Sequence, residues 1–446
     1  MRISVIKAFI FLFPFFFAYN CAAGDFSLFS PSNLSEEIER LNVEIPPALP
    51  APAQNEANSG NETSPAENES PHKHAASFFN NVKGINLPQY AFSRTSGISA
   101  MLVSAINNSK KSVEAALYGI TLQDVAEALV AAKKRGVKIR ILLNERHAFV
   151  RPSEQIEYLK KQGINIRTLK GISYYGIMHN KIGIFDSQVL ATGSFNWVFT
   201  ADNANHENIV FTVDKYEVEG YKKYFEWMWD YSRDISEGPY DSTYPYDYFG
   251  TPPSITPSLN FNSVCLPVFT FSPHGNVKDV TISGINAAKK EIKAAIFSLY
   301  SQNIANALIE AKKRGVKIEI VTDRVQASQS TVIKPLVEAG IKLRWTRGFN
   351  KGVMHHKFAV LDGKLIMTGS YNWSNSAEYY NFENVFLSMD RSYAEGFSKE
   401  FDFIYSSAHE PTMDELIQND EEAKCLSLKR NFPPFSTEDP YIEYDF

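Results

Sequence analysis

The sequence predicts an α/β fold made of two tandem repeats, each a mixed, largely parallel β-sheet flanked by helices. The first observation behind this prediction is an internal duplication, because residues 132–139 recur letter for letter as residues 311–318. A period of about 180 residues indicates a duplicated domain, since solenoid repeats run at about 20–50 residues. The second observation is that apolar and amphipathic segments alternate in both copies, as they do where helices join parallel strands.

The elements of the first copy follow in order from local patterns. An opening helix leads to an apolar strand near residues 113–118, which corresponds to residues 292–299 in the second copy. A helix with apolar side chains at helical spacing comes next and ends at Gly136. The strand 138–143 and the helix 153–162 follow. The later part of each copy, which contains the motifs described below, is expected to form a strand hairpin and then a helix.

Composition assigns the remaining segments. Residues 1–23 combine a positive start, a short apolar run and small residues, which predicts a signal peptide and export to the periplasm or the medium, with an uncleaved anchor as the alternative. The acidic residues 24–77, rich in Asn, Ser and Pro, are expected to form a disordered linker. The remaining expected boundaries are a first repeat at 78–235, an inter-repeat linker at 236–275, a second repeat at 276–410 and an acidic tail at 411–446.

Charge and cysteine content narrow the function. The chain has a net charge of −5, but its acidic flanks leave the middle mildly basic. That charge suits an anionic substrate and falls short of the strongly basic surface of dedicated nucleic-acid binders. Cys265 and Cys425 could pair in an oxidising compartment or remain buried thiols. No CxxC spacing is present, so the sequence predicts no metal centre and no cofactor.

Each copy carries the same polar residues at the same spacing. A histidine and a lysine two positions apart are followed by an aspartate, then by a Gly-Ser-aromatic-Asn-Trp segment and a Glu-Asn pair. In the first copy the polar residues are His179, Lys181, Asp186, Ser194, Asn196 and Glu207. In the second copy they are His355, Lys357, Asp362, Ser370, Asn372 and Glu383. Coincidence is a poor explanation for one pattern that occurs twice with identical spacing.

These residue types suit the chemistry of a phosphodiester. Alternate residues of a strand share a face, so each histidine is expected beside its lysine. Two histidines, two lysines and two asparagines from the combined copies could surround one tetrahedral anion, with Ser194 and Ser370 as further substrate ligands. Paired imidazoles can supply a nucleophile and a proton donor. Glu207 and Glu383 are candidates to accept a hydrogen bond from the ring nitrogen that does not react.

Neighbouring polar residues have simpler interpretations. Asp186 and Asp362 belong to the candidate catalytic set, although their place in hairpin turns favours a structural role. His356 is expected to be a bystander, because it faces away from the two motif residues on either side of it. His206 is expected at the surface or near the pocket.

The motif HxKxxxxD followed by GSxN resembles the signature of the phospholipase D superfamily, and residues 354–384 resemble its branch of mitochondrial cardiolipin hydrolases, Zucchini nucleases and small exported bacterial endonucleases. The resemblance covers roughly residues 98–405. It implies that the two motifs meet at a pseudo-twofold axis, that one histidine attacks phosphorus to form a phosphohistidine, and that the other protonates the leaving alcohol without a metal. By position His179 is the nucleophile and His355 the acid, although a near-symmetric site allows the reverse.

Two functions follow from this resemblance. The first is a phospholipase D-type hydrolase that converts phospholipid into phosphatidic acid and a free headgroup, with peripheral membrane contact through the apolar segment 172–178. The alternative is an exported, metal-independent endonuclease that cuts DNA or RNA. A non-catalytic scaffold is disfavoured, because both motifs are intact. No obligate protein partner is expected, since the duplicated motif makes a monomer sufficient.

Overall fold

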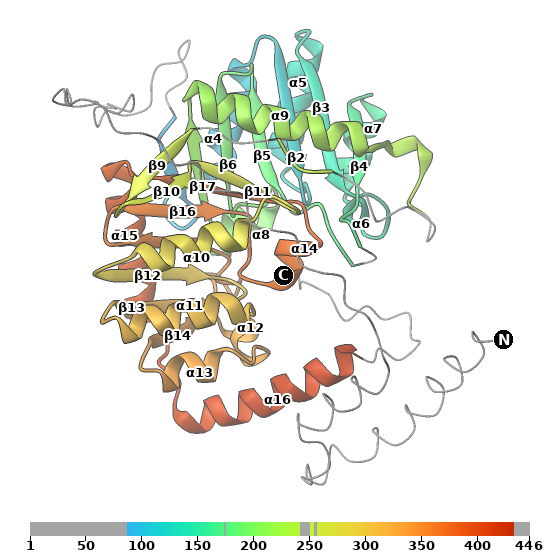
Figure 1. Cartoon of the computed structure of the whole chain (residues 1–446). Helices are drawn as coiled ribbons and strands as arrows, with labels where there is room; N and C mark the ends of the chain where they lie inside the picture. The colour runs from blue at the N-terminus through green and yellow to red at the C-terminus, as the bar shows by residue number, and fades with distance from the viewer. Residues whose placement is uncertain (1–86, 174, 241–249, 254–256, 432–446) are drawn as a thin grey trace, which may run out of the picture. The chain divides into compact units, whose positions relative to one another are not determined.

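The computed structural model describes residues 87–173, 175–240, 250–253 and 257–431 (Figure 1). The expected signal peptide at 1–23 and the expected linker at 24–77 lie outside these described residues. Within the described part of the chain, every helix is too short or too polar to cross a membrane.

The first repeat forms an eight-stranded sheet. Its strands are β1 (Tyr90–Phe92), β2 (Ser112–Leu117), β3 (Lys138–Asn144), β4 (Asn165–Leu169), β5 (Lys181–Phe185), β6 (Val189–Gly193), β7 (Asn208–Thr212) and β8 (Arg233–Asp234). Their order in the sheet is β1-β7-β6-β5-β2-β3-β4-β8. The expected strand 138–143 and the hairpin after the first motif are therefore present, as β3 and as β5 with β6.

The second repeat forms a seven-stranded sheet with the same plan. Its strands are β11 (Phe269–Ser272), β12 (Glu291–Ile296), β13 (Lys317–Asp323), β14 (Lys342–Thr346), β15 (Lys357–Leu361), β16 (Leu365–Gly369) and β17 (Glu383–Ser388). Their order is β11-β17-β16-β15-β12-β13-β14, which matches the first sheet strand for strand from β1 to β4. A separate hairpin of β9 (Ser258–Phe261) and β10 (Val264–Pro267) precedes it.

Parallel pairing is the minor part of each sheet, which corrects the expectation of largely parallel sheets. Among the described strands, β2-β3-β4 and β12-β13-β14 are parallel, and the other neighbours in both sheets are antiparallel. The reason is topological, because hairpin connections can join only antiparallel neighbours. In the motif half of each repeat, the hairpins β5–β6 and β15–β16 are such connections, while the parallel strands of the other half are joined through α5 and α7 or through α11 and α13.

Helices cover both faces of each sheet (Figure 1). Those of the first repeat are α4 (Ile98–Asn108), α5 (Gln123–Lys134), α6 (Glu145–Phe149), α7 (Glu154–Lys161), α8 (Phe199–Asn203), α9 (Lys215–Tyr231) and the 3-10 turn η1 (Ile235–Glu237). Those of the second are α10 (Val277–Ala287), α11 (Gln302–Lys313), α12 (Arg324–Ser328), α13 (Ile333–Glu338), α14 (Asn375–Tyr379), α15 (Arg391–Ser407) and α16 (Met413–Asn431). The pairs α4/α5 and α10/α11 bury one face of their sheets, and α9 and α15 bury the other.

The two repeats dock by exchanging contacts between an edge strand and a long helix. Phe271 of β11 stacks on Tyr224 of α9, with ring centroids 3.8 Å apart. A Cβ atom added to Gly220 of α9 would lie 1.9 Å from the Phe269 ring, so only glycine permits this approach. Gly396 of α15 admits Tyr90 of β1 in the same way, at 2.1 Å. This reciprocal packing holds the motif ends of the two sheets together.

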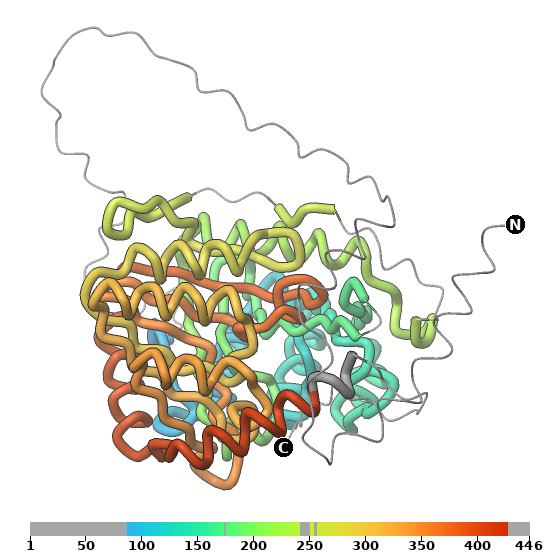
Figure 2. The backbone as a smooth tube through the Cα atoms, turned by 60° about the horizontal axis from the view of Figure 1, so that its bottom comes forward, coloured from blue at the N-terminus to red at the C-terminus, as the bar shows by residue number. Residues whose placement is uncertain are grey.

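The structure also changes the expected boundaries. The second sheet begins with β11, inside the segment expected as linker 236–275, because a strand of four residues is too short to stand out in a Pro- and Tyr-rich stretch. The expected acidic tail 411–446 contains α16, whose buried Leu416 and Ala423 belong to the side that packs beside α12 and α13 (Figure 2). Cys265 is an exposed free thiol and Cys425 is half-buried, so neither is the buried thiol of one alternative, and they do not form the disulfide of the other.

Candidate active site

The two HxK motifs meet because each one pairs with the other repeat. The backbone N–H of His179 donates to the carbonyl of Phe382 at 3.0 Å, and that of His355 donates to the carbonyl of His206 at 3.0 Å. The segment before β5 thus runs beside the segment before β17, and the segment before β15 runs beside the segment before β7. These reciprocal contacts are those that a pseudo-twofold relation requires.

Each histidine is held by the glutamate of the opposite repeat. Nδ1 of His179 lies 2.8 Å from Oε2 of Glu383, and Nδ1 of His355 lies 2.7 Å from Oε1 of Glu207. Both carboxylates are fully buried. Since Nδ1 is engaged by a carboxylate, Nε2 is the nitrogen with which each ring can react, and the carboxylate offsets part of the cost that burial imposes on a positively charged ring.

Each glutamate is itself fixed by an asparagine that is not among the residues predicted for the site. Asn381 donates from Nδ2 to Oε1 of Glu383 at 3.0 Å, and Asn205 bonds to Glu207. The signal was available in the sequence, because both copies carry an asparagine two residues before the glutamate. Alternate residues of an extended chain share a face, so the repetition indicates a common role.

Ser194 and Ser370 use their hydroxyl groups within the protein, which favours a supporting role over the expected role as substrate ligands. Both side chains are fully buried. Their hydroxyl oxygens accept the backbone N–H groups of Asn208 and Asn384 at 3.0 Å, and the Ser194 hydroxyl donates to Glu207 at 2.6 Å. The two serines therefore support the glutamate segments.

The two motif lysines bring positive charge into the buried site. Nζ of Lys181 donates to the carbonyl of its own histidine, His179, at 2.6 Å, and Nζ of Lys357 donates to that of His355 at 2.8 Å. Each ammonium also faces an aromatic ring, that of Tyr118 or Phe297, at 5.2 and 4.7 Å from the ring centroid. These cations are placed to neutralise non-bridging oxygens of a bound phosphate.

The asparagines of the GSxN segments are nearly buried, and they follow β6 and β16. Asn196 is 5% exposed and Asn372 is 4% exposed. Among the described residues, Oδ1 of Asn196 has no hydrogen-bond partner. A buried amide of this kind is suited to bind a substrate, because a ligand can complete its hydrogen bonds.

Burial also acts on the acid–base groups of the site. It lowers the pKa of His355 well below the ordinary value, and the charges of Lys357 and Lys181 add to the effect. It raises the pKa of Glu207 to about 8, against the influence of the same lysines. Lys181 belongs to the first repeat, so its effect on His355 reflects the proximity of the two motifs.

Asp186 and Asp362 lie away from the histidines, at the far ends of β5 and β15. The Asp186 carboxylate accepts the backbone N–H groups of residues 110–112, at 2.6 to 3.0 Å. The Asp362 carboxylate accepts those of residues 289–291 in the same way. They tie the helix–strand connection to the hairpin, which favours the structural interpretation over their inclusion in the catalytic set.

Two further histidines, His206 and His356, lie outside the reacting pair. His356 faces away from the reacting pair, in line with the expected role of a bystander in the reaction, and its ring lies fully buried within a polar cluster. His206 lies in the same cluster, is only 7% exposed and directly precedes Glu207, so of the two expected positions it has the one near the pocket and not the one at the surface. Glu400 of α15 completes the cluster. The local pattern could not reveal it, since Glu400 is far from both histidines in the sequence.

Comparisons with known proteins agree with this geometry. A family model described as "Cardiolipin synthase, PLD-like domain" matches the chain twice, over residues 102–229 and 281–405. Mitochondrial cardiolipin hydrolase of Xenopus tropicalis is 33% identical over 119 residues, which are 26% of this chain and 56% of that protein. Cardiolipin synthase A of Proteus mirabilis is 26% identical over 342 residues, which are 70% of this chain and 67% of that protein.

The likeness also extends to a solved structure. Phosphatidylserine synthase of Haemophilus influenzae aligns with a TM-score of 0.59 over 77% of this chain and 93% of that one, and at 10% identity the likeness is one of fold. The chain spans little more than half the length of the mitochondrial relatives that it matches. These matches confirm the resemblance inferred from the motifs. Since the family model covers more than half of the chain, the protein belongs to the phospholipase D-like family.

Proposed function

We propose that this protein is a phosphodiesterase that hydrolyses phospholipid to phosphatidic acid and a free headgroup through a phosphohistidine intermediate. The observation that carries the proposal is the reciprocal pair of buried hydrogen bonds, His179 to Glu383 and His355 to Glu207. Each bond presents Nε2 of one histidine to the same site, where two lysine cations can receive a phosphate. One ring acts as the nucleophile and the other as the acid.

The proposed reaction has two steps. Nε2 of His179 attacks phosphorus, the P–O bond to the headgroup breaks, and His355 gives its proton to the departing alkoxide. His355 then removes a proton from water, whose oxygen attacks phosphorus and breaks the P–N bond. The second step releases phosphatidic acid and restores both rings. Lys181 and Lys357 offset the charge of the non-bridging oxygens, and Asn196 and Asn372 hold the phosphate in line for attack.

Exposed aromatic side chains beside the His179 strand support a lipid substrate. Tyr379 and Tyr380 of the α14 region are 45% and 44% exposed, and Tyr175, in the loop before the first motif, is 36% exposed. The Tyr380 carbonyl accepts the backbone N–H of Ile172 at 2.9 Å, so these tyrosines flank one loop. Tyrosine suits the boundary between acyl chains and water. The curated relatives are named for a phospholipid, cardiolipin.

The test compares substrates for the same purified protein. Mixed vesicles of cardiolipin, phosphatidylglycerol and phosphatidylethanolamine are assayed for phosphatidic acid and released headgroup, beside single- and double-stranded DNA and RNA in low salt. With ethanol present, phosphatidylethanol should also form, because an alcohol can replace water at the phosphohistidine. Cleavage of nucleic acid with intact vesicles would reject the lipid substrate and favour the nuclease, since aromatic side chains also stack on unpaired bases.

A further inference from the structure

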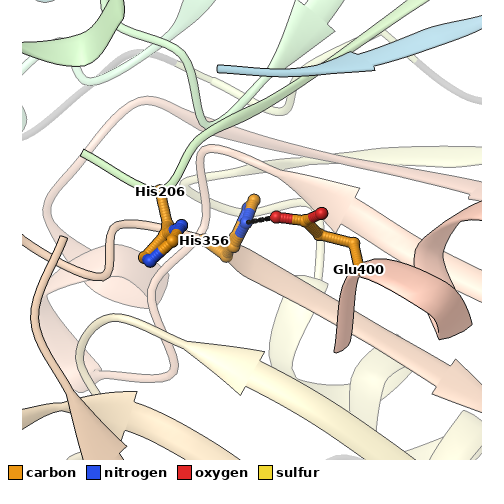
Figure 3. Close-up of side chains that lie close together, drawn as sticks. All are labelled: His206, His356 and Glu400. Carbon is orange, nitrogen blue, oxygen red and sulfur yellow. Dashed lines mark ion pairs between the residues drawn. The ribbon is translucent and has the colours of Figure 1, made fainter. Parts of the chain in front are cut away.

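The strongest feature outside the reaction centre is the buried cluster of His206, His356 and Glu400 (Figure 3). We propose that this cluster binds one divalent transition-metal ion, with Zn²⁺ as the best fit. The ion would be structural, because none of the three side chains takes part in the proposed reaction. This inference does not depend on the proposed function.

The geometry of the cluster supports a common ligand. Each residue contributes one potential ligand atom, and the three atoms lie within 4.8 Å of one another. Nε2 of His356 and Oε1 of Glu400 face each other as an ion pair at 3.7 Å, a separation that is longer than a hydrogen bond (Figure 3). Among the described residues, neither these two atoms nor Nδ1 of His206 has a hydrogen-bond partner, although all three are buried. Buried polar atoms are rarely left in this state, so a group that bonds to all of them is expected.

The pseudo-twofold counterpart of the cluster provides an internal comparison. With the offset that separates His179 from His355, the counterparts of the three cluster residues are Phe382, Asn180 and Tyr224. There Nδ2 of Asn180 donates to the Tyr224 hydroxyl at 3.3 Å and to the Phe382 carbonyl at 3.1 Å. Neutral residues that hydrogen-bond to one another are therefore compatible with the fold at these positions. The cluster, with His206 from the first repeat and His356 and Glu400 from the second, has metal-ligand residues at all three positions, which the fold alone does not require.

The ligand set and its surroundings are compatible with zinc. Two imidazoles and a carboxylate are a common set for Zn²⁺, with ligand bonds of about 2.0–2.2 Å, so the side chains would close around the ion by less than about 1 Å. Arg94 contacts Oε2 of Glu400 at 3.2 Å and leaves Oε1 directed towards the histidines. The rings of Phe92 and Phe358 pack around His356 at 6.0 and 5.0 Å and exclude water.

A metal ligand role for His356 places a requirement on which of its ring nitrogens carries the proton. Its Nδ1 lies 2.9 Å from Nδ2 of Asn208, and metal ligation at Nε2 requires a proton on Nδ1. The Asn208 amide must then present its oxygen to the ring. Thr368, whose hydroxyl contacts the same amide at 2.7 Å, can donate or accept and so permits that orientation.

The position of the cluster indicates what the ion would do. His206 precedes Glu207, and His356 follows His355, so two of the ligands flank the hydrogen bond that orients a reacting histidine. An ion bound to both would fix the β7 and β15 segments to each other and to α15. The expected effect is greater thermal stability of the second motif, without a direct part in phosphoryl transfer.

The test measures zinc in the purified full-length protein after chelation, dialysis and incubation with Zn²⁺. Wild type should retain one equivalent more than His206→Phe, which carries the residue of the other repeat, and the variant should bind this equivalent about 100-fold more weakly or worse. His409→Gln is the matched control, because His409 contacts Glu415 at 2.9 Å in an exposed His–Glu pair. This control should bind as much zinc as wild type.

Two further measurements keep the test decisive if His206→Phe folds poorly. Glu400→Gln preserves side-chain size and the contact with Arg94, and it should also lose the equivalent. X-ray absorption of wild type with one equivalent of zinc should show scattering from two imidazoles. The proposal is overturned if wild type and both cluster variants bind equal amounts of zinc, or if wild type binds none. Phosphodiesterase assays are not part of the readout, so failure here leaves the proposed function untouched.

Discussion

Glu383 bonds to His179 across 204 positions of sequence, at 2.8 Å and in a fully buried setting. The two residues belong to different repeats, and Glu207 completes the same relation with His355 at 2.7 Å. Neither repeat therefore contains a complete catalytic unit. Each repeat supplies a histidine that only the other repeat can orient, which makes docking of the repeats a condition for activity.

We expect His179→Ala and His355→Ala each to lower kcat for phospholipid by at least about 10³-fold, because each ring has a separate chemical task. The two variants should differ with a substrate whose leaving group departs without a proton. His355→Ala should then still form phosphoenzyme, detectable by acid-labile label, while His179→Ala should not. If His179→Ala is labelled instead, His355 is the nucleophile and His179 the acid. Substantial turnover of phospholipid by either variant would contradict the shared site.

Glu383→Gln and Glu207→Gln should lower kcat by roughly 10²–10⁴-fold with a small change in KM, because an amide can hold the ring but cannot stabilise its positive charge. The matched control is Glu378→Gln, which alters a buried carboxylate that bonds to the Tyr371 hydroxyl at 3.0 Å. The control should keep its kcat. The measurement is steady-state kinetics on protein whose folding has been checked by near-UV circular dichroism. An equal loss of kcat in all three variants would indicate a general loss of structure.

Asp362→Asn should lower the free energy of unfolding and leave kcat per folded molecule unchanged. Three backbone N–H groups and the Asn262 side chain bond to this carboxylate. Burial opposes ionisation, but these hydrogen bonds together lower the pKa of Asp362 below its ordinary value. The stabilisation is therefore complete above the unfolded pKa of about 3.9 and disappears as the pH falls through the lower folded value. Urea unfolding of both proteins from pH 7 down to pH 3 measures this, and a difference that grows on acidification would contradict it.

Turnover should survive excess EDTA, because the proposed steps use only protein side chains. If the cluster of His206, His356 and Glu400 holds zinc, prolonged chelation should lower the melting temperature while the initial rate stays within about twofold of the untreated value. The check is a parallel measurement of rate and melting curve on one chelated sample. Complete loss of turnover that one divalent ion restores would be incompatible with the phosphohistidine route.

We also expect the exported form to begin between Ala22 and Asp25, because the small residues near Ala22 are suited to cleavage. N-terminal sequencing of protein recovered outside the cytoplasm measures this directly. A mature chain that retains residues 1–19 would instead support the uncleaved anchor.

The sequence by itself determined the candidate reacting residues and the plan of the repeats. Identical spacing in both copies was enough to select His179, Lys181, His355 and Lys357, and the turn signals after each motif predicted the two hairpins correctly. The motifs and the hairpins are formed by residues that are close together in the chain, so they can be predicted from a local sequence pattern. The same reasoning failed for β11, because a four-residue strand carries too little pattern, and for the sheets, whose strand order is fixed by pairing across the fold.

Tertiary structure alone decided which glutamate serves which histidine. Glu207 and Glu383 have the same spacing to the motif of their own repeat, so no local rule can assign them to the opposite one. It also turned the Ser194 hydroxyl towards Glu207 and brought His356 to Glu400. The physical reason is that the two His–Glu bonds cross between repeats, which dock where Phe269 and Tyr90 pack against glycines of the opposite helices, while the other two contacts depend on the folding of a single repeat. The local sequence contains the candidate reacting residues, and the packing of one repeat on the other determines which glutamate bonds to which histidine.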